Sequence, residues 1–161
     1  MFDSWLRSPL VAVVREALGD VALRGEHTIV VGDAALAKAL IGAGHASRAA
    51  AVSPRAAKHL PALVEGSAHA LVLGDQSLAA LVGVGAGGSA GAAQLLEWVR
   101  VVRPGGRIVL VDRCSLEKAS ARALCAGLGE IEQRSSGRMV ITSGVVPAPA
   151  FAPAPAPAPA P

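Results

Sequence analysis

The stretch LLEWVRVVRPGGRIVLVD, residues Leu95–Asp112, decides the fold. Apolar residues recur at helical spacing in its first half, with charged residues between them, which predicts an amphipathic helix. The Pro-Gly-Gly turn at residues 104–106 ends that helix, because proline cannot continue it and glycine tolerates a positive φ. Ile108–Val111 is a continuous aliphatic run, which is typical of a strand buried on both faces. The stretch therefore predicts a helix, a sharp turn and a central strand that ends at Asp112, and we expect the neighbours of this strand to run parallel to it.

Helices and strands alternate on both sides of this stretch. Strands are predicted at Thr28–Val31, Ala49–Val52, Ala70–Leu73, Glu130–Arg134 and Met139–Ser143. Helices are predicted at Ala34–Ile41, Arg55–Glu65, Ser77–Val82 and Ser115–Leu128, and an N-terminal helix is expected to begin with Ser8 as its cap and Pro9 in its first turn. This alternation predicts an α/β fold, a doubly wound and mostly parallel sheet with one layer of helices on each face. The last two strands form a C-terminal antiparallel hairpin.

The composition indicates one globular domain followed by an unusual tail. Of the 161 residues, 52% are apolar, which excludes disorder for the body of the chain. We expect an N-terminal helix over residues 1–27, an α/β domain over residues 28–146 and a Pro-Ala tail over residues 147–161. Every odd position of the tail except Phe151 is proline, which predicts an extended polyproline II spacer. Prolines at a spacing of two do not make the P-x-x-P docking pattern.

The charge and the aromatic content argue against several classes of partner. The net charge of +3 comes from scattered Arg and Lys, and aromatic residues make up only 2%, so no nucleic-acid surface is predicted. The run Gln76–Leu96 is 21 residues without a charge, nominally enough to cross a membrane. Its glycines and alanines favour a loop between two core helices instead. The N-terminus has no basic region followed by an apolar one, so we expect no signal peptide.

The two cysteines are Cys114 and Cys125, and a disulfide between them is excluded if both lie on the helix after Asp112. Eleven residues of helix would separate them by roughly 16 Å, which is too far for a disulfide. We therefore expect a reduced, cytoplasmic protein. The four histidines show no metal-ligand spacing, so no metal site is predicted.

Residues Arg100–Ile108, RVVRPGGRI, resemble a run near the fifth strand of class I S-adenosylmethionine-dependent methyltransferases of the type 11 group. The resemblance extends over about Thr28 to Val145 and implies a Rossmann-like sheet whose last strand is reversed. It also implies a truncated sheet with one strand missing. Only fifteen residues lie between Pro54 and Ala70, where the family has a helix and a strand. In such a sheet, ligands bind beyond the carboxyl ends of the strands.

The resemblance places the methionine part of the cofactor, S-adenosylmethionine, at the end of the first strand. The family has an acidic residue and three glycines there. This chain has Val30 in place of the acid, keeps Gly32, and has Ala34 and Leu36 in place of the later glycines. Asp33 is the residue that could substitute for the lost acid. The cofactor-binding residues predicted at this end are therefore Gly32, Asp33 and Ala34.

The ends of the second and third predicted strands complete the expected site. In the family a carboxylate at the second end binds both ribose hydroxyls, but Ala51 occupies that position here, beside Val52 and Ser53. Loss of such a charge-assisted contact costs about 1.5–3 kcal/mol, or about ten- to a hundredfold in affinity. Gly74 and Asp75 follow the third predicted strand. Asp75 is the candidate catalytic base, and the alternative is a loop or helix-capping aspartate.

The glycine-rich run Gly83–Gly91 matches two further motifs. Gly83–Gly88 fits G-x-G-x-x-G, a dinucleotide-binding pattern, but no clear strand is predicted before it and no acidic residue lies about twenty positions further on. Gly87–Gly91 fits G-x-S-x-G, but that hydrolase motif requires a later histidine, and the last histidine is His69. A nucleotide-binding oxidoreductase is therefore only the third hypothesis.

Two functions rank before it. The resemblance implies an S-adenosylmethionine-dependent methyltransferase that acts on a small molecule, mainly by placing the activated methyl group in line with a nucleophile. The eroded cofactor motifs and the tail indicate the alternative, a degenerate, non-catalytic module of the same fold that acts in protein interaction or regulation. The sequence leaves open whether the chain is an enzyme, which small molecule or protein is its partner, and whether it forms oligomers.

Overall fold

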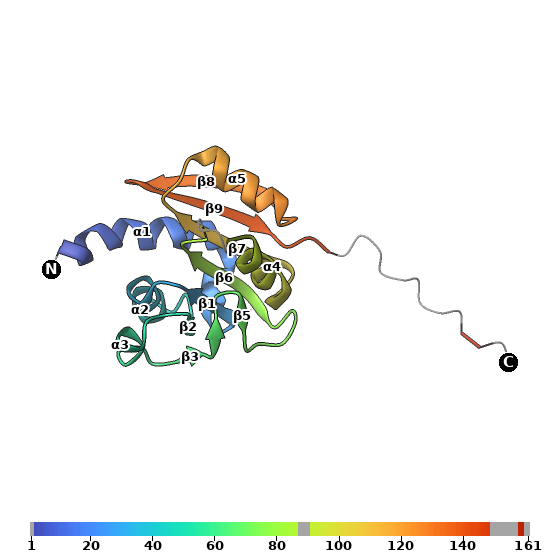
Figure 1. Cartoon of the computed structure of the whole chain (residues 1–161), viewed down its shortest axis with the longest axis horizontal. Coiled ribbons are helices and arrows are strands. Elements are labelled where there is room, and N and C mark those ends of the chain that lie inside the picture. Colours follow the sequence, from blue (N-terminus) through green and yellow to red (C-terminus); the bar gives the residue numbers. More distant parts are fainter. Residues whose placement is uncertain (1, 87–90, 149–157, 160–161) are drawn as a thin grey trace.

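Figure 1 shows the computed structural model, which describes residues 2–86, 91–148 and 158–159. Its main feature is a sheet of seven strands. In spatial order these are β3 (Leu63–Val64), β2 (Arg48–Ala50), β1 (Thr28–Val31), β6 (Leu78–Val84), β7 (Val102–Asp112), β9 (Met139–Val145) and β8 (Gly129–Ser136). The first five strands run parallel, and β9 is antiparallel to both β7 and β8. The predicted fold class, a mostly parallel α/β sheet with a C-terminal antiparallel hairpin, is confirmed.

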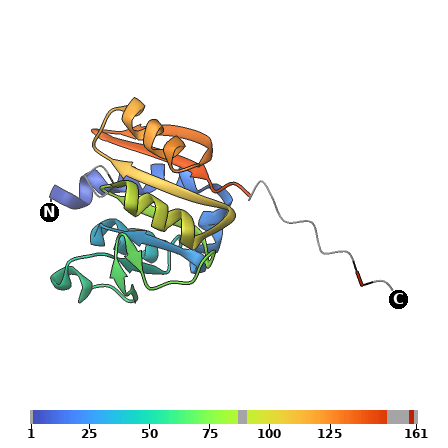
Figure 2. The same ribbon diagram turned by 45° about the vertical axis from the view of Figure 1, so that its right-hand side comes forward.

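Helices cover both faces of the sheet (Figure 2). One layer consists of α1 (Phe2–Leu18) and α2 (Ala34–Gly42), and the other consists of α4 (Gly91–Val101) and α5 (Leu116–Cys125). A 3-10 helix, η1 (Gly19–His27), leads from α1 to β1. Side chains along β7 alternate between the two layers: Val109 and Val111 pack with α1 and α2, whereas Ile108 and Leu110 pack with α4 and α5. Both faces of the central strands are buried, which explains their continuous apolar sequence.

The stretch around residues 104–106 forms the predicted helix and strand, but these three residues lie inside β7 and not in a turn between the two elements. α4 ends at Val101 and β7 begins at Val102, so the helix passes directly into the strand. Gly105 has a φ of +79°, and its N–H donates a hydrogen bond to the carbonyl oxygen of Val146 at 2.7 Å. The expectation that all neighbours of β7 run parallel to it is wrong, since β6 is parallel and β9 is antiparallel. β7 is therefore the last strand of the parallel group.

β6 is the main difference between the predicted and the observed elements. Residues 77–82, predicted as a helix, and residues 83–91, predicted as a loop, contain a strand in the middle of the sheet. Alanine and leucine favour a helix when propensity alone decides. Here burial between two helical layers favours a strand over a helix. The small residues leave room for the Trp98 ring, which a Cβ on Gly83 would overlap.

The segment between β2 and β6 contains shorter elements than predicted. The predicted helix over residues 55–65 is wrong, because α3 spans only Pro54–Ala57 and is followed by β3. A strand of the main sheet thus forms in the segment where the resemblance implied that one was missing. The prediction that Ala70–Leu73 forms a strand of the main sheet is also wrong. Only Ala70–Leu71 forms a strand, β5, which pairs with β4 (Gly66–Ser67) outside the main sheet. Strands of two residues carry too few side chains to show a period in the sequence.

The two ends of the fold differ in how well they follow the prediction. α1 begins at Phe2, so Ser8 does not cap it and Pro9 lies inside the helix. At the other end, the predicted helix and hairpin are confirmed. Ser115 caps α5 by accepting the N–H of Lys118 at 3.3 Å. Both cysteines are free thiols. Within the described residues, no helix has both the length and the apolar character needed to cross a membrane.

Candidate functional site

Two turns at the carboxyl edge of the sheet form the framework of the candidate site. After β1, Gly32 adopts a φ of +92°, which glycine tolerates far better than other residues. Its N–H donates a hydrogen bond to the carbonyl oxygen of Ala50 at 3.0 Å, and a Cβ at this position would lie 2.7 Å from the carbonyl oxygen of Val84. Gly32 is thus required where the ends of β1, β2 and β6 meet.

Asp33 follows Gly32 and caps α2. Its Oδ1 accepts the N–H of Ala35 at 2.9 Å and the N–H of Leu36 at 2.8 Å, and Ala34 is the first residue of the helix. A carboxylate in this position also interacts favourably with the positive end of the helix dipole. These two backbone donors, which could otherwise bind an anionic ligand, are therefore already satisfied by the protein itself.

The turn after β2 reaches the same edge, because β1 and β2 are parallel neighbours. Ala51 has a φ of +52°, a left-handed conformation that costs a non-glycine residue about 1–2 kcal/mol. Val52 packs against the layer of α1 and α2. The Oγ of Ser53 accepts the N–H of Ala56 at 3.3 Å and so caps α3. The structure therefore brings five of the predicted cofactor residues to one edge of the sheet: Gly32, Asp33, Ala34, Val52 and Ser53.

Replacing Ala51 by glycine is expected to raise the free energy of unfolding by about 0.5–1 kcal/mol, because glycine adopts the left-handed region without strain. The neighbouring Ala50 is the matched control. It is fully buried in β2, so Ala50→Gly should lower the free energy of unfolding. Urea denaturation followed by circular dichroism measures both variants. Two shifts of the same sign would contradict the conformational strain assigned to Ala51.

The end of β6 contributes a turn that the sequence-based assignment of elements missed. Gly85 has a φ of +80°, and its N–H donates a hydrogen bond to the carbonyl oxygen of Val111 at 3.2 Å. Ala86 is fully buried, and a Cβ on Gly91, the first residue of α4, would overlap its carbonyl oxygen. The G-x-G-x-x-G match at Gly83–Gly88 therefore overlaps the end of a strand and precedes a helix.

The signal for this turn was the apolar run Leu78–Val84 that leads into the glycines. Assigning that run to a helix moved the third strand end of the expected site to the wrong place. Residues 87–90, which hold most of the G-x-S-x-G match, lie outside the described residues. In the part of the chain that the structure describes, no group of three or more His, Cys, Asp and Glu side chains could hold a metal ion.

Asp112 lies at the carboxyl end of β7 and is 3% exposed. Nη1 of Arg122, from α5, lies 3.5 Å from its Oδ2 and forms an ion pair with it. Burial raises the pKa of Asp112 above its usual value. The charge of Arg122 and the nearby backbone N–H groups of Gly85 and Ala86 oppose this increase only in part, since neither N–H reaches hydrogen-bond geometry with the carboxylate. Asp112 is thus a buried, ion-paired carboxylate.

Gly74 and Asp75 lie at the opposite edge of the sheet, so their prediction as the carboxyl end of a strand is wrong. The chain passes through them just before β6 begins at Leu78, which pairs with Val102, the first residue of β7. Oδ1 of Asp75 accepts a hydrogen bond from Nη1 of Arg100 at 2.6 Å, and the Asp75 side chain is 75% exposed. Asp75 therefore anchors a loop on α4 and is separated by the length of the sheet from the predicted cofactor residues.

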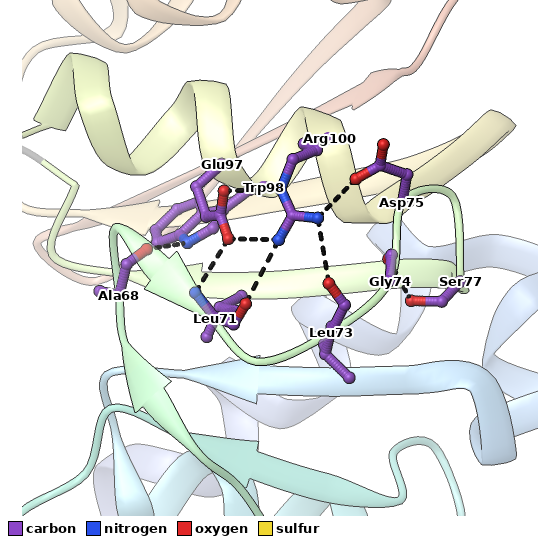
Figure 3. A network of polar contacts seen from close by, with 9 residues as sticks. All are labelled: Ala68, Leu71, Leu73, Gly74, Asp75, Ser77, Glu97, Trp98 and Arg100. Atoms are coloured by element: carbon purple, nitrogen blue, oxygen red, sulfur yellow. Dashed lines mark hydrogen bonds and ion pairs between the residues drawn. The ribbon is translucent and has the colours of Figure 1, made fainter.

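A polar network on α4 holds this loop in place (Figure 3). Arg100 donates hydrogen bonds to the carbonyl oxygens of Leu71 at 3.3 Å and Leu73 at 3.0 Å, and pairs with Glu97 at 2.6 Å. Glu97 also accepts the N–H of Leu71 at 2.9 Å. The hydrogen bond from Arg100 lowers the pKa of Glu97, so the pair remains charged. The network fastens residues 71–75 to α4 and has a structural role.

Comparison with known proteins tests the fold. No protein-family model and no curated protein matches the sequence. An S-adenosylmethionine-dependent methyltransferase from Thermotoga maritima matches with 15% identity and a TM-score of 0.64, over 90% of this chain and 94% of its own. A second match is the 1,6-didemethyltoxoflavin-N1-methyltransferase of Burkholderia thailandensis, with bound S-adenosylhomocysteine. It has 12% identity and a TM-score of 0.67, and the match covers 89% of this chain and 78% of the other. The cyclase SpnF matches with 13% identity and a TM-score of 0.68, over 86% of this chain and 80% of its own. Identities at this level show a shared fold.

Proposed function

Because this chain has the fold of class I S-adenosylmethionine-dependent methyltransferases, we propose that it binds S-adenosylmethionine and transfers the methyl group to a small molecule. The observation that carries the proposal is the junction of Gly32, Ala50 and Val84, where three parallel strands end together. Ligands of doubly wound sheets bind at such an edge. S-adenosylhomocysteine, bound in one of the matching structures, is what remains of the cofactor after methyl transfer.

Five residues would hold the cofactor. In the proposed arrangement the backbone at Gly32, Asp33 and Ala34 lies beside its methionine part, and Val52 and Ser53 lie beside its adenosine. The Ser53 hydroxyl already accepts one hydrogen bond, and as a hydroxyl it also has a proton to donate. When bound, the cofactor supplies an activated methyl group on a sulfonium. The chain then contributes mainly by orienting the methyl group and its acceptor.

Two observations favour a second candidate, a non-catalytic module that binds a small molecule or a protein partner. First, Ala51 offers no carboxylate at the end of β2. Second, the Oδ1 of Asp33 is already engaged by two backbone N–H groups of α2, which limits its use toward a ligand. The backbone at Gly32 therefore fits the cofactor, whereas the side chains of Asp33 and Ala51 offer it little. One matching structure is named a cyclase, so the fold alone does not require methyl transfer.

Titration calorimetry with S-adenosylmethionine and S-adenosylhomocysteine tests the proposal on the wild type and on two variants. Ala51→Asp restores a carboxylate at the end of β2 and is expected to tighten binding about ten- to a hundredfold. Ala51→Asn is the matched control, because asparagine also tolerates the left-handed backbone and has no charge. Its affinity should remain close to that of the wild type.

The outcomes separate the two candidates. Wild-type binding that Ala51→Asp tightens would support cofactor binding at this edge. Binding by Ala51→Asp alone would show that the edge retains the shape for the cofactor and that the wild type is the non-catalytic module. If neither protein responds to millimolar ligand, the cofactor proposal is overturned.

A further inference from the structure

A pocket lies between α4 and α5, next to Ala86 in the turn after β6. Its volume is about 430 Å³, within the range of small-molecule sites. Apolar side chains line most of it: Ala92, Leu95 and Leu96 from α4, Ala121 and Cys125 from α5, and Ala126, the C-cap of α5. Leu96, Ala121 and Cys125 are exposed, so the pocket is open on its outer side. It offers a concave apolar surface that a ligand can enter without any rearrangement of the core.

Arg122 is the single charged residue among the described residues that line this pocket. Its Nη1 is buried and makes no hydrogen bond within the described part of the chain. The carboxylate of Asp112, 3.5 Å away, attracts the guanidinium without completing its hydrogen bonds. A guanidinium has five N–H donors, and leaving a buried donor without an acceptor is unfavourable. Nη1 itself is out of reach of a ligand, but the Arg122 side chain as a whole is 26% exposed, so the pocket wall contains a cation that can pair with an acceptor on a ligand.

Asp112 lies behind this wall and forms the ion pair with Arg122. Alternation along β7 puts its side chain on the same face as Ile108 and Leu110, beneath α4 and α5. It is 3% exposed, and neither carboxylate oxygen accepts a hydrogen bond within the described residues. A buried ion pair without further hydrogen bonds is costly to keep. Because Arg122 lines the pocket and Asp112 does not, an acceptor on a ligand that pairs with Arg122 would recover part of that cost.

We propose that this pocket binds a small apolar molecule with one anionic hydrogen-bond acceptor, a carboxylate or a sulfonate, which pairs with Arg122. The apolar body contacts α4 and α5, and the acceptor pairs with the guanidinium of Arg122. The site uses none of the residues proposed to hold the cofactor. It therefore does not depend on methyl transfer.

Anilinonaphthalene sulfonate is a suitable probe, because it joins an apolar aromatic body to one anionic acceptor and fluoresces when bound. The wild type is expected to bind one equivalent. Arg122→Gln should weaken binding about tenfold or more, the effect of losing a hydrogen bond to a charged group. Asp112→Asn should tighten it, since one negative charge near the acceptor is removed. Lys118→Gln, an exposed cation on the same helix, is the matched control and should change nothing.

A filling variant locates the site independently of charge. Ala121 is exposed and lines the pocket, so Ala121→Trp fills the pocket without crowding the core and should abolish binding. In a Cys114→Ser protein, Cys125 is the one remaining thiol, and saturating probe should slow its alkylation as measured by mass spectrometry. Circular dichroism confirms that each variant is folded. The proposal would be overturned if Ala121→Trp left the binding of the probe unchanged. It would also be overturned if Arg122→Gln and Asp112→Asn weakened binding to the same extent.

Discussion

Replacing Gly83 by alanine is expected to lower the free energy of unfolding by about 3 kcal/mol, near the upper end of the usual range for overpacking a core. The added methyl group would overlap three atoms of the Trp98 ring. The ring has no room to withdraw, because it is fully buried and its Nε1–H donates a hydrogen bond to the carbonyl oxygen of Ala68 at 2.8 Å. Domains of this size have a total stability of about 5–15 kcal/mol, so the variant should unfold at clearly lower urea concentration.

Gly42→Ala is the matched control for this variant. Gly42 is the last residue of α2, its φ is not positive, and a Cβ added there would have no neighbour within 4 Å. Alanine should therefore be neutral or stabilise the helix by up to about 1 kcal/mol. Urea denaturation followed by circular dichroism compares the two. A loss of less than about 0.5 kcal/mol for Gly83→Ala would mean that α4 is not held tightly against β6.

Replacing Trp98 by alanine is expected to have the largest effect of any single substitution considered, a loss of about 3–5 kcal/mol. The change removes the largest fully buried side chain of the described residues and leaves a cavity between α4 and β6. It also removes the donor that binds the carbonyl oxygen of Ala68. Trp98→Phe is the intermediate case, because it keeps a six-membered aromatic ring and loses the N–H together with the rest of the five-membered ring. Its expected cost is smaller by at least about 1 kcal/mol.

Combining both substitutions tests whether the two positions act through one contact. When the ring is absent, the methyl group at position 83 has nothing to overlap and fills part of the cavity. The double variant Gly83→Ala with Trp98→Ala should therefore be more stable than the sum of the two single losses predicts, by about 1–3 kcal/mol. Strict additivity in urea denaturation would show that the two positions do not contact each other in solution.

The parts of the fold that the sequence predicted well are those whose signal is local and redundant. At the start of β7, an amphipathic helix, a proline, two glycines and an aliphatic run all indicate one arrangement. The same holds for α5, where Ser115 provides the cap, and for the C-terminal hairpin. In each case several neighbouring residues favour the same structure, so one weak signal does not change the outcome.

The middle of the chain was predicted poorly because tertiary contacts, not local preferences, determine it. The alanines of β6 favour a helix by propensity, and the strand forms because Trp98 and both helical layers require a thin central strand. That one error had a direct effect on the site. It made Ala70–Leu73 the third strand of the expected site and so placed Asp75 at the wrong edge. The residues of the β1 and β2 turns were located well, because both strands were assigned close to their observed positions.

The burial of Trp98 also makes intrinsic tryptophan fluorescence a probe of the protein core. The chain has two tryptophans and no tyrosine, and the other tryptophan is Trp5. After a Trp5→Phe substitution, all indole emission would come from a ring that lies against Gly83 on β6 and is shielded from solvent. The wavelength of that emission would then report directly, and without an attached dye, whether α4 is seated on the sheet.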